Sequence, residues 1–200
     1  MYKLKIQKLF SFVLIGVILF TANALFSQSQ KATTFTSTIT INGTSNLHDW
    51  NTKVEQIKGE FLVSGSNVIQ TLNVKFPVQN IKSGDRLMDK KTYETLNSSK
   101  NPTIAFTLTE PSTAIIGNNN DIQVTLTGNL TVAGVTKKVS FKSIGTKTSN
   151  GYQVSGTVPL KLSDFSMKAP TALLGMLKTG DAVTIKIEVN VPEQNLVAIY

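Results

Sequence analysis

This chain has no cysteine and a single histidine, and both shortages limit its chemistry. Without cysteine it forms no disulfide, binds no metal through thiolates and carries no lipid on a cysteine thioether. The lone His48 beside Asp49 is too little for a metal site, so we interpret it as a loop residue held by a hydrogen bond. No G-x-S-x-G motif is present, which the nucleophile elbow of many serine hydrolases requires. We therefore predict no catalytic residues, no metal ligands and no cofactor.

Acidic residues are also scarce, with 12 Asp and Glu against 20 Lys and Arg, and so are the interfacial aromatics, with only four Tyr and one Trp. These aromatics are too few for the two girdles of an outer-membrane barrel. No basic stripe interleaves with aromatics as in single-strand nucleic-acid binders, so we expect no nucleic-acid partner. The lysines are scattered over predicted strands, where they discourage edge pairing: Lys75, Lys138, Lys142, Lys161 and Lys186.

The first 24 residues have the pattern of a secretory signal peptide. Lys3, Lys5 and Lys8 precede an apolar run from Leu9 to Phe20, and Ala22-Asn23-Ala24 fits a small-x-small cleavage site. The run of about 12 apolar residues is shorter than the ~20 that a spanning helix needs. We predict a signal peptide at 1–24 and one domain at 25–200, either periplasmic or secreted. Cleavage removes three lysines and no acid, so the formal charge falls from +8 to +5.

Most of the remaining chain alternates apolar and polar residues with a period of two. From Ile122 to Val132, apolar residues or Gly occupy one phase, and Gln, Thr and Asn the other. A β-strand places these two sets on opposite faces, and one wet face is typical of antiparallel sheets. A slip between Val54 and Ile57 predicts a bulge in the second strand. The pattern predicts eight strands, at 35–41, 52–63, 72–78, 104–108, 122–132, 135–142, 152–162 and 183–191.

Two connections differ from turns. Asp85 to Asn97 places Met88, Thr92 and Leu96 four residues apart, which predicts a short helix between strands three and four. Ser163 to Ala182 is unusually apolar for a loop, and it serves either as a plug for one end of the core or as a lid over a ligand entrance. We expect a ligand to enter near the Met88 helix or near Leu173–Leu177, where apolar residues leave the strand register.

Eight such strands are compatible with a two-sheet sandwich, a closed soluble barrel or an outer-membrane barrel. In a soluble barrel the apolar phase faces the lumen, which is then dry and uncharged. Met88 and Met167 would give this lumen an adaptable lining. The predicted ligand-binding residues are Phe61, Leu72, Val74, Phe76, Met88, Ile104, Phe106, Leu126, Leu130, Phe141, Val154, Val158, Met167, Ile185 and Ile187.

An ordered set of motifs gives this chain a family resemblance. They are Ile41-Asn42-Gly43-Thr44-Ser45-Asn46-Leu47-His48-Asp49-Trp50, Gly59-Glu60-Phe61, Asp85-Arg86-Leu87-Met88, Asn101-Pro102-Thr103-Ile104-Ala105-Phe106, Thr127-Gly128-Asn129-Leu130-Thr131-Val132-Ala133-Gly134-Val135-Thr136-Lys137, Asp164-Phe165-Ser166-Met167 and Gly180-Asp181-Ala182-Val183. From about Thr38 to Val191 the chain resembles the YceI-like family of exported, lipocalin-like polyisoprenoid-binding proteins. The resemblance implies an all-β fold, an extended eight-stranded antiparallel barrel whose apolar pore takes a long isoprenoid chain. It also implies a possible homodimer.

The chain departs from the usual family pattern beside the expected pocket. Better-characterised members have a histidine near Met88 and a glycine where Ser166 stands. The expected function is binding of a polyisoprenoid or other lipid for storage, transport or envelope stress protection, with transient contact to a membrane surface as a further possibility. Two alternatives stay open: an enzyme of the hydrolase or isomerase type acting on an apolar substrate, and a filled barrel that acts through its surface.

Overall fold

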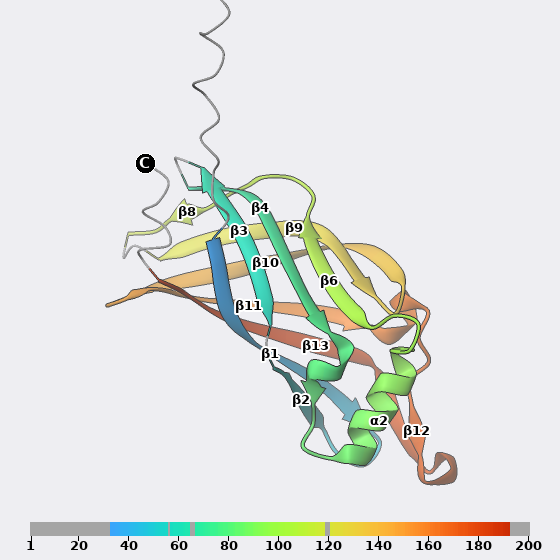
Figure 1. Cartoon of the computed structure of the whole chain (residues 1–200). Helices are drawn as coiled ribbons and strands as arrows, with labels where there is room; N and C mark the ends of the chain where they lie inside the picture. The colour runs from blue at the N-terminus through green and yellow to red at the C-terminus, as the bar shows by residue number, and fades with distance from the viewer. Residues whose placement is uncertain (1–32, 56, 65–66, 119–120, 193–200) are drawn as a thin grey trace, which may run out of the picture. The chain divides into compact units, whose positions relative to one another are not determined.

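The computed structural model describes residues 33–192 except 56, 65–66 and 119–120, so the predicted signal peptide lies outside the described residues. This part of the chain forms thirteen strands and one α-helix (Figure 1). In chain order the elements are β1 (Thr33–Ser45), β2 (Trp50–Val54), β3 (Lys58–Ser64), β4 (Val68–Pro77), the 3-10 helix η1 (Val78–Asn80), β5 (Ile81–Lys82), α2 (Arg86–Thr95), β6 (Thr103–Leu108), β7 (Ser112–Thr113), β8 (Ile115–Ile116), β9 (Ile122–Val132), β10 (Val135–Thr148), β11 (Gly151–Lys161), η2 (Leu162–Phe165), β12 (Thr171–Ala172), η3 (Leu173–Gly175) and β13 (Leu177–Pro192).

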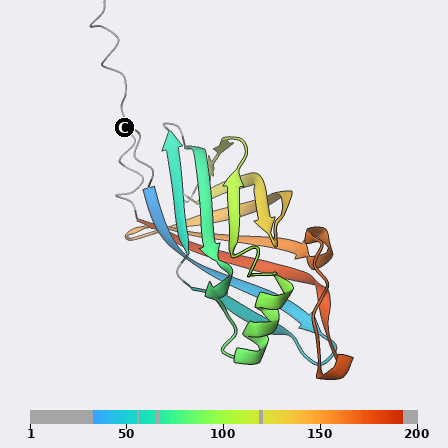
Figure 2. The same ribbon diagram turned by 45° about the vertical axis from the view of Figure 1, so that its right-hand side comes forward.

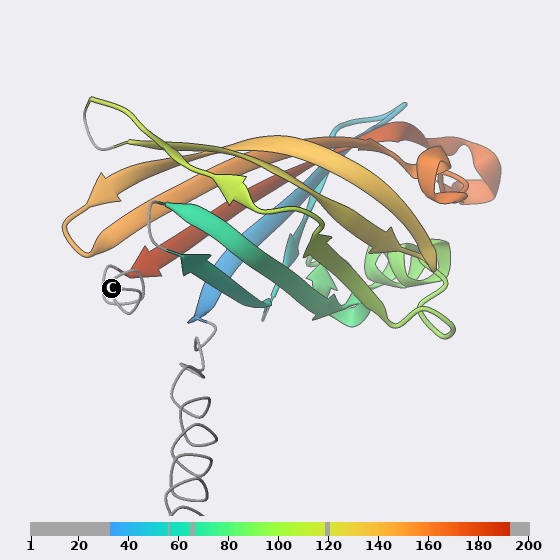
Figure 3. The same ribbon diagram turned by 90° about the horizontal axis from the view of Figure 1, so that it is seen from above.

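The strands form one antiparallel sheet that curls on itself, as Figure 3 shows from above. Neighbouring pairs run β1–β3–β4–β6–β9–β10–β11–β13, and β13 pairs with β1 again through register partners such as Ile39 and Ile187. The prediction of an all-β, antiparallel, barrel-like fold is confirmed. The predicted total of eight strands was wrong, because the described residues contain five additional short strands, β2, β5, β7, β8 and β12.

The predicted strand at 52–63 is two strands rather than one bulged strand. β2 pairs with β5, where Val54 faces Ile81, whereas β3 pairs with β4. β1 is long enough to pair with both β2 and β3. Between them the Glu55 N–H donates to the Asn80 carbonyl at 2.9 Å. The slip in the apolar phase therefore marks the point where the chain changes partner strands.

β9 shows why the alternation fixes the two faces of the sheet. Along it Val124, Leu126, Gly128, Leu130 and Val132 are buried, while the residues that alternate with them are exposed or half-buried. β9 and β10 pair in continuous register from Val132–Val135 to Ile122–Gly145. The two-residue turn Ala133–Gly134 has φ values of 49° and 81°, the left-handed conformations that suit a tight hairpin.

The single α-helix of the described residues, α2, lies between β5 and β6, within the range 85–97. Asp85 caps its start: its side chain accepts the backbone N–H groups of Leu87 at 2.7 Å and Met88 at 3.0 Å. The helix ends at Thr95, and Leu96, the C-cap residue that follows, is buried. In Figure 2, α2 and the segment between β11 and β13 lie at the same end of the strands.

That segment between β11 and β13 divides into two parts with opposite exposure. Phe165 and Met167 are buried and belong to the core. Leu174 and Met176 are among the most exposed large apolar residues, at 106% and 71%. The first part therefore acts as a plug, whereas the second extends away from the core into solvent.

Candidate functional site

The inward faces of the strands surround a cavity of about 600 Å³. This volume lies within the ~300–1,000 Å³ usual for pockets that take small molecules. Its lining residues come from most of the strands, from the end of α2 and from η2, and most are aliphatic or aromatic. Lys161 is the single charged residue among those that line the cavity in the described part of the chain, and it is exposed.

The cavity brings together almost all the residues that the sequence predicts to bind a ligand. Met88 is the exception, because it does not line the cavity and is half-buried on α2. Thr92, Thr95 and Leu96 contact the cavity instead. Met88 lies four residues, about 6 Å along the helix axis, before Thr92 on the same face of α2, so it falls short of the cavity. The predicted residues that do line it are Phe61, Leu72, Val74, Phe76, Ile104, Phe106, Leu126, Leu130, Phe141, Val154, Val158, Met167, Ile185 and Ile187.

Aromatic rings lie against glycines on the inner faces of several strands. The Phe106 ring covers Gly128, the Trp50 ring covers Gly43, and the Phe35 ring covers Gly59. A Cβ on Gly128 would lie only 2.5 Å from the Phe106 Cζ, so the ring position requires the missing side chain. A glycine at an inward position of a strand is the feature of the sequence that could have pointed to these ring–glycine contacts. The alternation of apolar and polar residues by itself did not predict them.

The cavity wall differs in exposure along its length. Ile81 on β5, the strand that precedes α2, is 1% exposed and belongs to the same buried cluster as Leu96. Trp50, Pro170 and Thr179 are half-buried, as are Val189 and Val191 near the other end of β13. Pro170 and Thr179, which flank the segment Leu173–Leu177, line the cavity. Entry of a ligand near this segment remains a prediction.

Hydroxyl-bearing residues interrupt the apolar lining at several points, and the strand phase did not single out Ser37, Thr52 and Ser143 among them. Thr52 is 2% exposed and Ser143 is 4% exposed, and Ser37 lies on the inner face of β1 between Phe35 and Ile39. The Ser37 Oγ and Thr52 Oγ1 atoms are buried without a hydrogen-bond partner in the described structure.

A short hydrogen-bond pair anchors η2, and with it Phe165, to β13. Asp181 accepts the Ser163 hydroxyl at 2.6 Å and the Ser163 backbone N–H at 2.8 Å. The hydroxyl and then the N–H hold the pKa of Asp181 below its usual range. Because Phe165 is 2% exposed and lines the cavity, this anchor supports one part of the cavity wall.

Replacing Ser163 by Ala is expected to raise the pKa of Asp181 toward its ordinary value. A pKa lowered by folding adds stability that is complete above the unfolded-state value, near ~3.9, and is lost as pH falls through the folded-state value. The acid limb of the stability curve of the Ala variant should therefore move to higher pH. Carboxyl NMR titration and urea unfolding between pH 2 and 6 measure both effects. Ser163→Thr, which keeps a hydroxyl, is the matched control, and an unchanged Asp181 pKa in Ser163→Ala would contradict the assignment.

Within the described residues, the side chains that could bind a metal ion do not cluster. His48 is exposed, and its Nδ1 lies 2.7 Å from the Asp49 carbonyl oxygen, as expected for a loop histidine. No group of three or more His, Cys, Asp or Glu side chains comes together there. Within the same residues, none of the helices has the length and hydropathy needed to cross a membrane.

A single antiparallel sheet curled around an apolar cavity defines the class of small β-barrel-like proteins with an internal pocket. The family model described as the YceI-like domain matches residues 30–191, so the chain belongs to the YceI-like family. No curated protein matches this sequence.

Several solved structures share the fold. The crystal structure of Burkholderia cenocepacia BcnA has a TM-score of 0.62 and 16% identity, covering 76% of this chain and 94% of BcnA. A polyisoprenoid binding domain from Saccharophagus degradans, implicated in plant cell wall breakdown, has a TM-score of 0.56 and 9% identity, covering 80% and 97%. The Campylobacter jejuni YceI protein has a TM-score of 0.55 and 19% identity, covering 76% and 85%. At these identities the likeness shows the fold.

Proposed function

We propose that this protein is an exported binding protein, not an enzyme, which holds a long apolar chain such as a polyisoprenoid in the barrel lumen. The observation that carries the proposal is the cavity of about 600 Å³, whose lining is predominantly apolar. Storage, transport or protection of envelope lipids are roles that such binding would serve. The solved Saccharophagus degradans relative, described as a polyisoprenoid binding domain, supports this choice of ligand class.

The physical match between cavity and guest is hydrophobic. Each ligand CH₂ transferred from water to a dry wall gains ~0.8 kcal/mol. A charged guest would find only Lys161 as a counter-charge, and this side chain is exposed at the border of the lining. A long alkyl or isoprenoid chain therefore gains more from this cavity than a polar metabolite does.

The direct test is native mass spectrometry of protein purified from the envelope fraction without detergent, followed by solvent extraction and lipid analysis. We expect a mass increment equal to one long-chain lipid, which disappears after delipidation and returns on incubation with an isoprenoid. The same spectra show whether the protein is a homodimer, as the family resemblance leads us to expect. Protein that carries no lipid and takes up none would instead favour a filled barrel acting through its surface.

Two hairpin tips form an exposed apolar patch that suits contact with a membrane surface. The tip patch consists of Leu47, Leu174 and Met176, which are 70%, 106% and 71% exposed. Asn46 joins the two tips: its side-chain amide donates to the Met176 carbonyl and accepts the Lys178 N–H, both at 2.8 Å. Exposed Lys178 beside the patch suits anionic headgroups, so we expect the patch to dip into the lipid interface during transfer.

A Leu174→Asp, Met176→Asp double variant is therefore expected to reduce binding to anionic vesicles at least about ten-fold, because two apolar anchors become charged. Vesicle co-sedimentation measures this, and lipid loading from solution should stay near wild type. Ile115→Asp is the matched control, because Ile115 is 70% exposed but lies on β8 at the other end of the strands. Equal losses in both variants would contradict a specific role for the tip patch.

Export is part of the proposal, since a protein that handles envelope lipids has to reach the envelope. The pattern of residues 1–24 supports it. N-terminal sequencing of protein from the envelope fraction is expected to begin near Leu25. Recovery of an intact Met1 would overturn the assignment of a cleaved signal peptide.

A further inference from the structure

The side chains that line the cavity become more exposed towards one end of the barrel. That end is formed by β8, by the start of β4, by the β10–β11 hairpin and by the last residues of β13, and in Figure 1 β8 and α2 lie at opposite ends of the strands. Ile116 of β8 lines the cavity and is 48% exposed, although its register partner Ile122 places it on the inner face of the sheet. A side chain that faces the lumen and is also exposed marks a point where the lumen opens to solvent.

Two consecutive rows of inward-facing residues show how sharply the exposure changes. The first row follows the register pairs across five strands and consists of Ile116, Ile122, Gly145, Val154 and Val189. Apart from Gly145, which has no side chain, these residues are half-buried or exposed. The next row, two residues closer to α2, includes Val124, Ser143 and Ile39, which are 7%, 4% and 6% exposed. The wall therefore changes from open to buried within about 7 Å of strand.

The rim of this opening is apolar. Besides Ile116 and Ile122 it contains Ile69 of β4, Tyr152 of β11 and Val191 of β13, all three of which line the cavity and are half-buried. We call these five residues the mouth. Because apolar surface in contact with water is unfavourable, a rim of this composition is stabilised when an apolar chain lies across it.

Packed and hydrogen-bonded segments cover the opposite end of the cavity. The residues that line it there include Ile81, Phe165 and Leu96, which are 1%, 2% and 8% exposed. Pro170 and Thr179 are less buried, but their backbones are joined, because the Thr179 N–H donates to the Pro170 carbonyl at 3.1 Å. A guest that entered at this end would have to displace buried side chains and break this bond.

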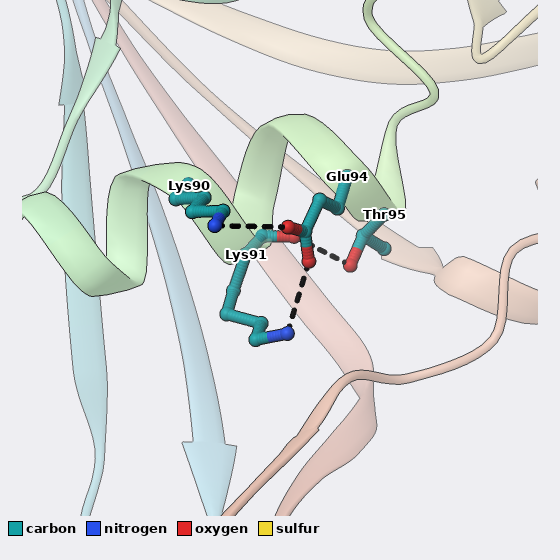
Figure 4. Close-up of polar contacts among 4 residues, drawn as sticks. All are labelled: Lys90, Lys91, Glu94 and Thr95. Atoms are coloured by element: carbon teal, nitrogen blue, oxygen red, sulfur yellow. Dashed lines mark hydrogen bonds and ion pairs between the residues drawn. The ribbon is translucent and has the colours of Figure 1, made fainter.

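α2 is also held in place at this closed end. The Tyr93 hydroxyl donates to the Ile81 carbonyl at 3.0 Å and so joins the helix to β5. Thr95, which lines the cavity, donates its hydroxyl to the Lys91 carbonyl at 2.8 Å (Figure 4). In the same turn Lys91 pairs with Glu94 at 2.9 Å on the side that faces away from the cavity. Entry beside α2 would therefore require the helix to leave β5.

We propose that the guest enters and leaves the lumen through the mouth, with its apolar chain inserted towards Phe165 and Leu96. This inference rests on the proposed lipid-binding function and assigns the route of the guest. It differs from the entry expected from the sequence, near Met88 or Leu173–Leu177, because that end is packed and bonded whereas the mouth is exposed. The tip patch lies at the closed end, so membrane contact through the patch and passage of the guest through the mouth are separate steps.

The test uses the absence of cysteine from the chain, because a single introduced cysteine is then labelled selectively after the protein has folded. A bulky polyethylene glycol is attached through a disulfide to Ile116→Cys in delipidated mature protein. Uptake of geranylgeraniol is followed by the fluorescence of Trp50, the single tryptophan, which lines the cavity near its closed end. The uptake rate is expected to fall at least about ten-fold, because the polymer blocks the mouth, and to recover when a reducing agent releases the polymer.

Ile115→Cys is the matched control, because Ile115 is the neighbouring residue of β8 and is exposed on the outer face of the sheet. Its labelled form should take up the probe as fast as its unlabelled form. Pro170→Cys tests the rival route, since Pro170 lines the cavity at the closed end, and its label should also leave the rate unchanged. If circular dichroism shows that Ile116→Cys is not folded, Ile69→Cys places the label on the opposite side of the mouth.

The outcomes separate the route from the function. An unchanged uptake rate in the labelled mouth variants, or an equal or larger loss in labelled Pro170→Cys, would overturn the mouth as the route and leave the lipid-binding lumen intact. Equal losses in labelled Ile115→Cys and Ile116→Cys would likewise overturn it, since the outer-face label does not enter the mouth. Failure of unlabelled wild type to take up geranylgeraniol would overturn the proposed function itself.

Discussion

A Leu126→Glu substitution is expected to lower lipid binding about 100-fold or more in protein that remains folded. Leu126 is 7% exposed on β9, faces the cavity and has Phe141 as its register partner. A carboxylate there has no counter-charge, so it keeps water in the lumen. The binding free energy of an apolar guest therefore becomes less favourable by several kcal/mol. Lipid extracted per mole of protein, measured after circular dichroism has verified the fold, reports the effect.

The matched control is Thr125→Glu, one residue away on the exposed face of β9. It adds the same charge to the same strand but leaves the lumen unchanged, so its lipid content should equal that of wild type. Val154→Lys extends the test to a half-buried part of the wall, in case Leu126→Glu fails to fold, with Gln153→Lys as its control. Normal lipid content in a folded lumen variant would contradict the assignment of the cavity as the binding site.

Gly128→Ala is expected to destabilise the barrel by about 2 kcal/mol, although it adds a single methyl group. The new Cβ would lie 2.5 Å from both the Phe106 ring and the Thr107 backbone oxygen. A ring can turn, but the backbone oxygen belongs to the β6–β9 pair, where Leu108 faces Gly128. The strands would have to separate locally, and urea unfolding at neutral pH measures the loss.

Gly145→Ala is the comparison that isolates this effect. Gly145 also lines the cavity, but its new Cβ would meet Val154 Cγ2 at 3.3 Å and Ile122 Cβ at 3.4 Å, tight contacts that a shift of a few tenths of an ångström relieves. The loss of chain entropy in the unfolded state favours alanine by ~0.4–1 kcal/mol, so the net change should stay within about 1 kcal/mol of zero. Similar large losses in both variants would show that glycine is needed on this face for another reason.

The residues of the cavity wall were largely predictable because strand alternation is local geometry. Once Leu126 faces inward, Val124 and Leu130 follow from the period of two, whatever the partner strand is. Met88 departed from the prediction because a helical face does not tell how far along its axis the helix reaches the cavity. Thr52 escaped notice because a threonine in the inward phase looks like an irregularity until its surroundings are known.

Local sequence by itself determined the all-β class, the inward and outward faces and the turn at Ala133–Gly134, each set by side chains within a few residues. Tertiary structure alone decided the closure of β1 on β13, where Ile39 meets Ile187, and the separation of β2 from β3. It also decided which hydroxyls remain unpaired inside. These features depend on which distant strands become neighbours. Because the side chains of the strands have similar hydrophobicity, many alternative strand pairings have almost the same free energy until the whole sheet has closed.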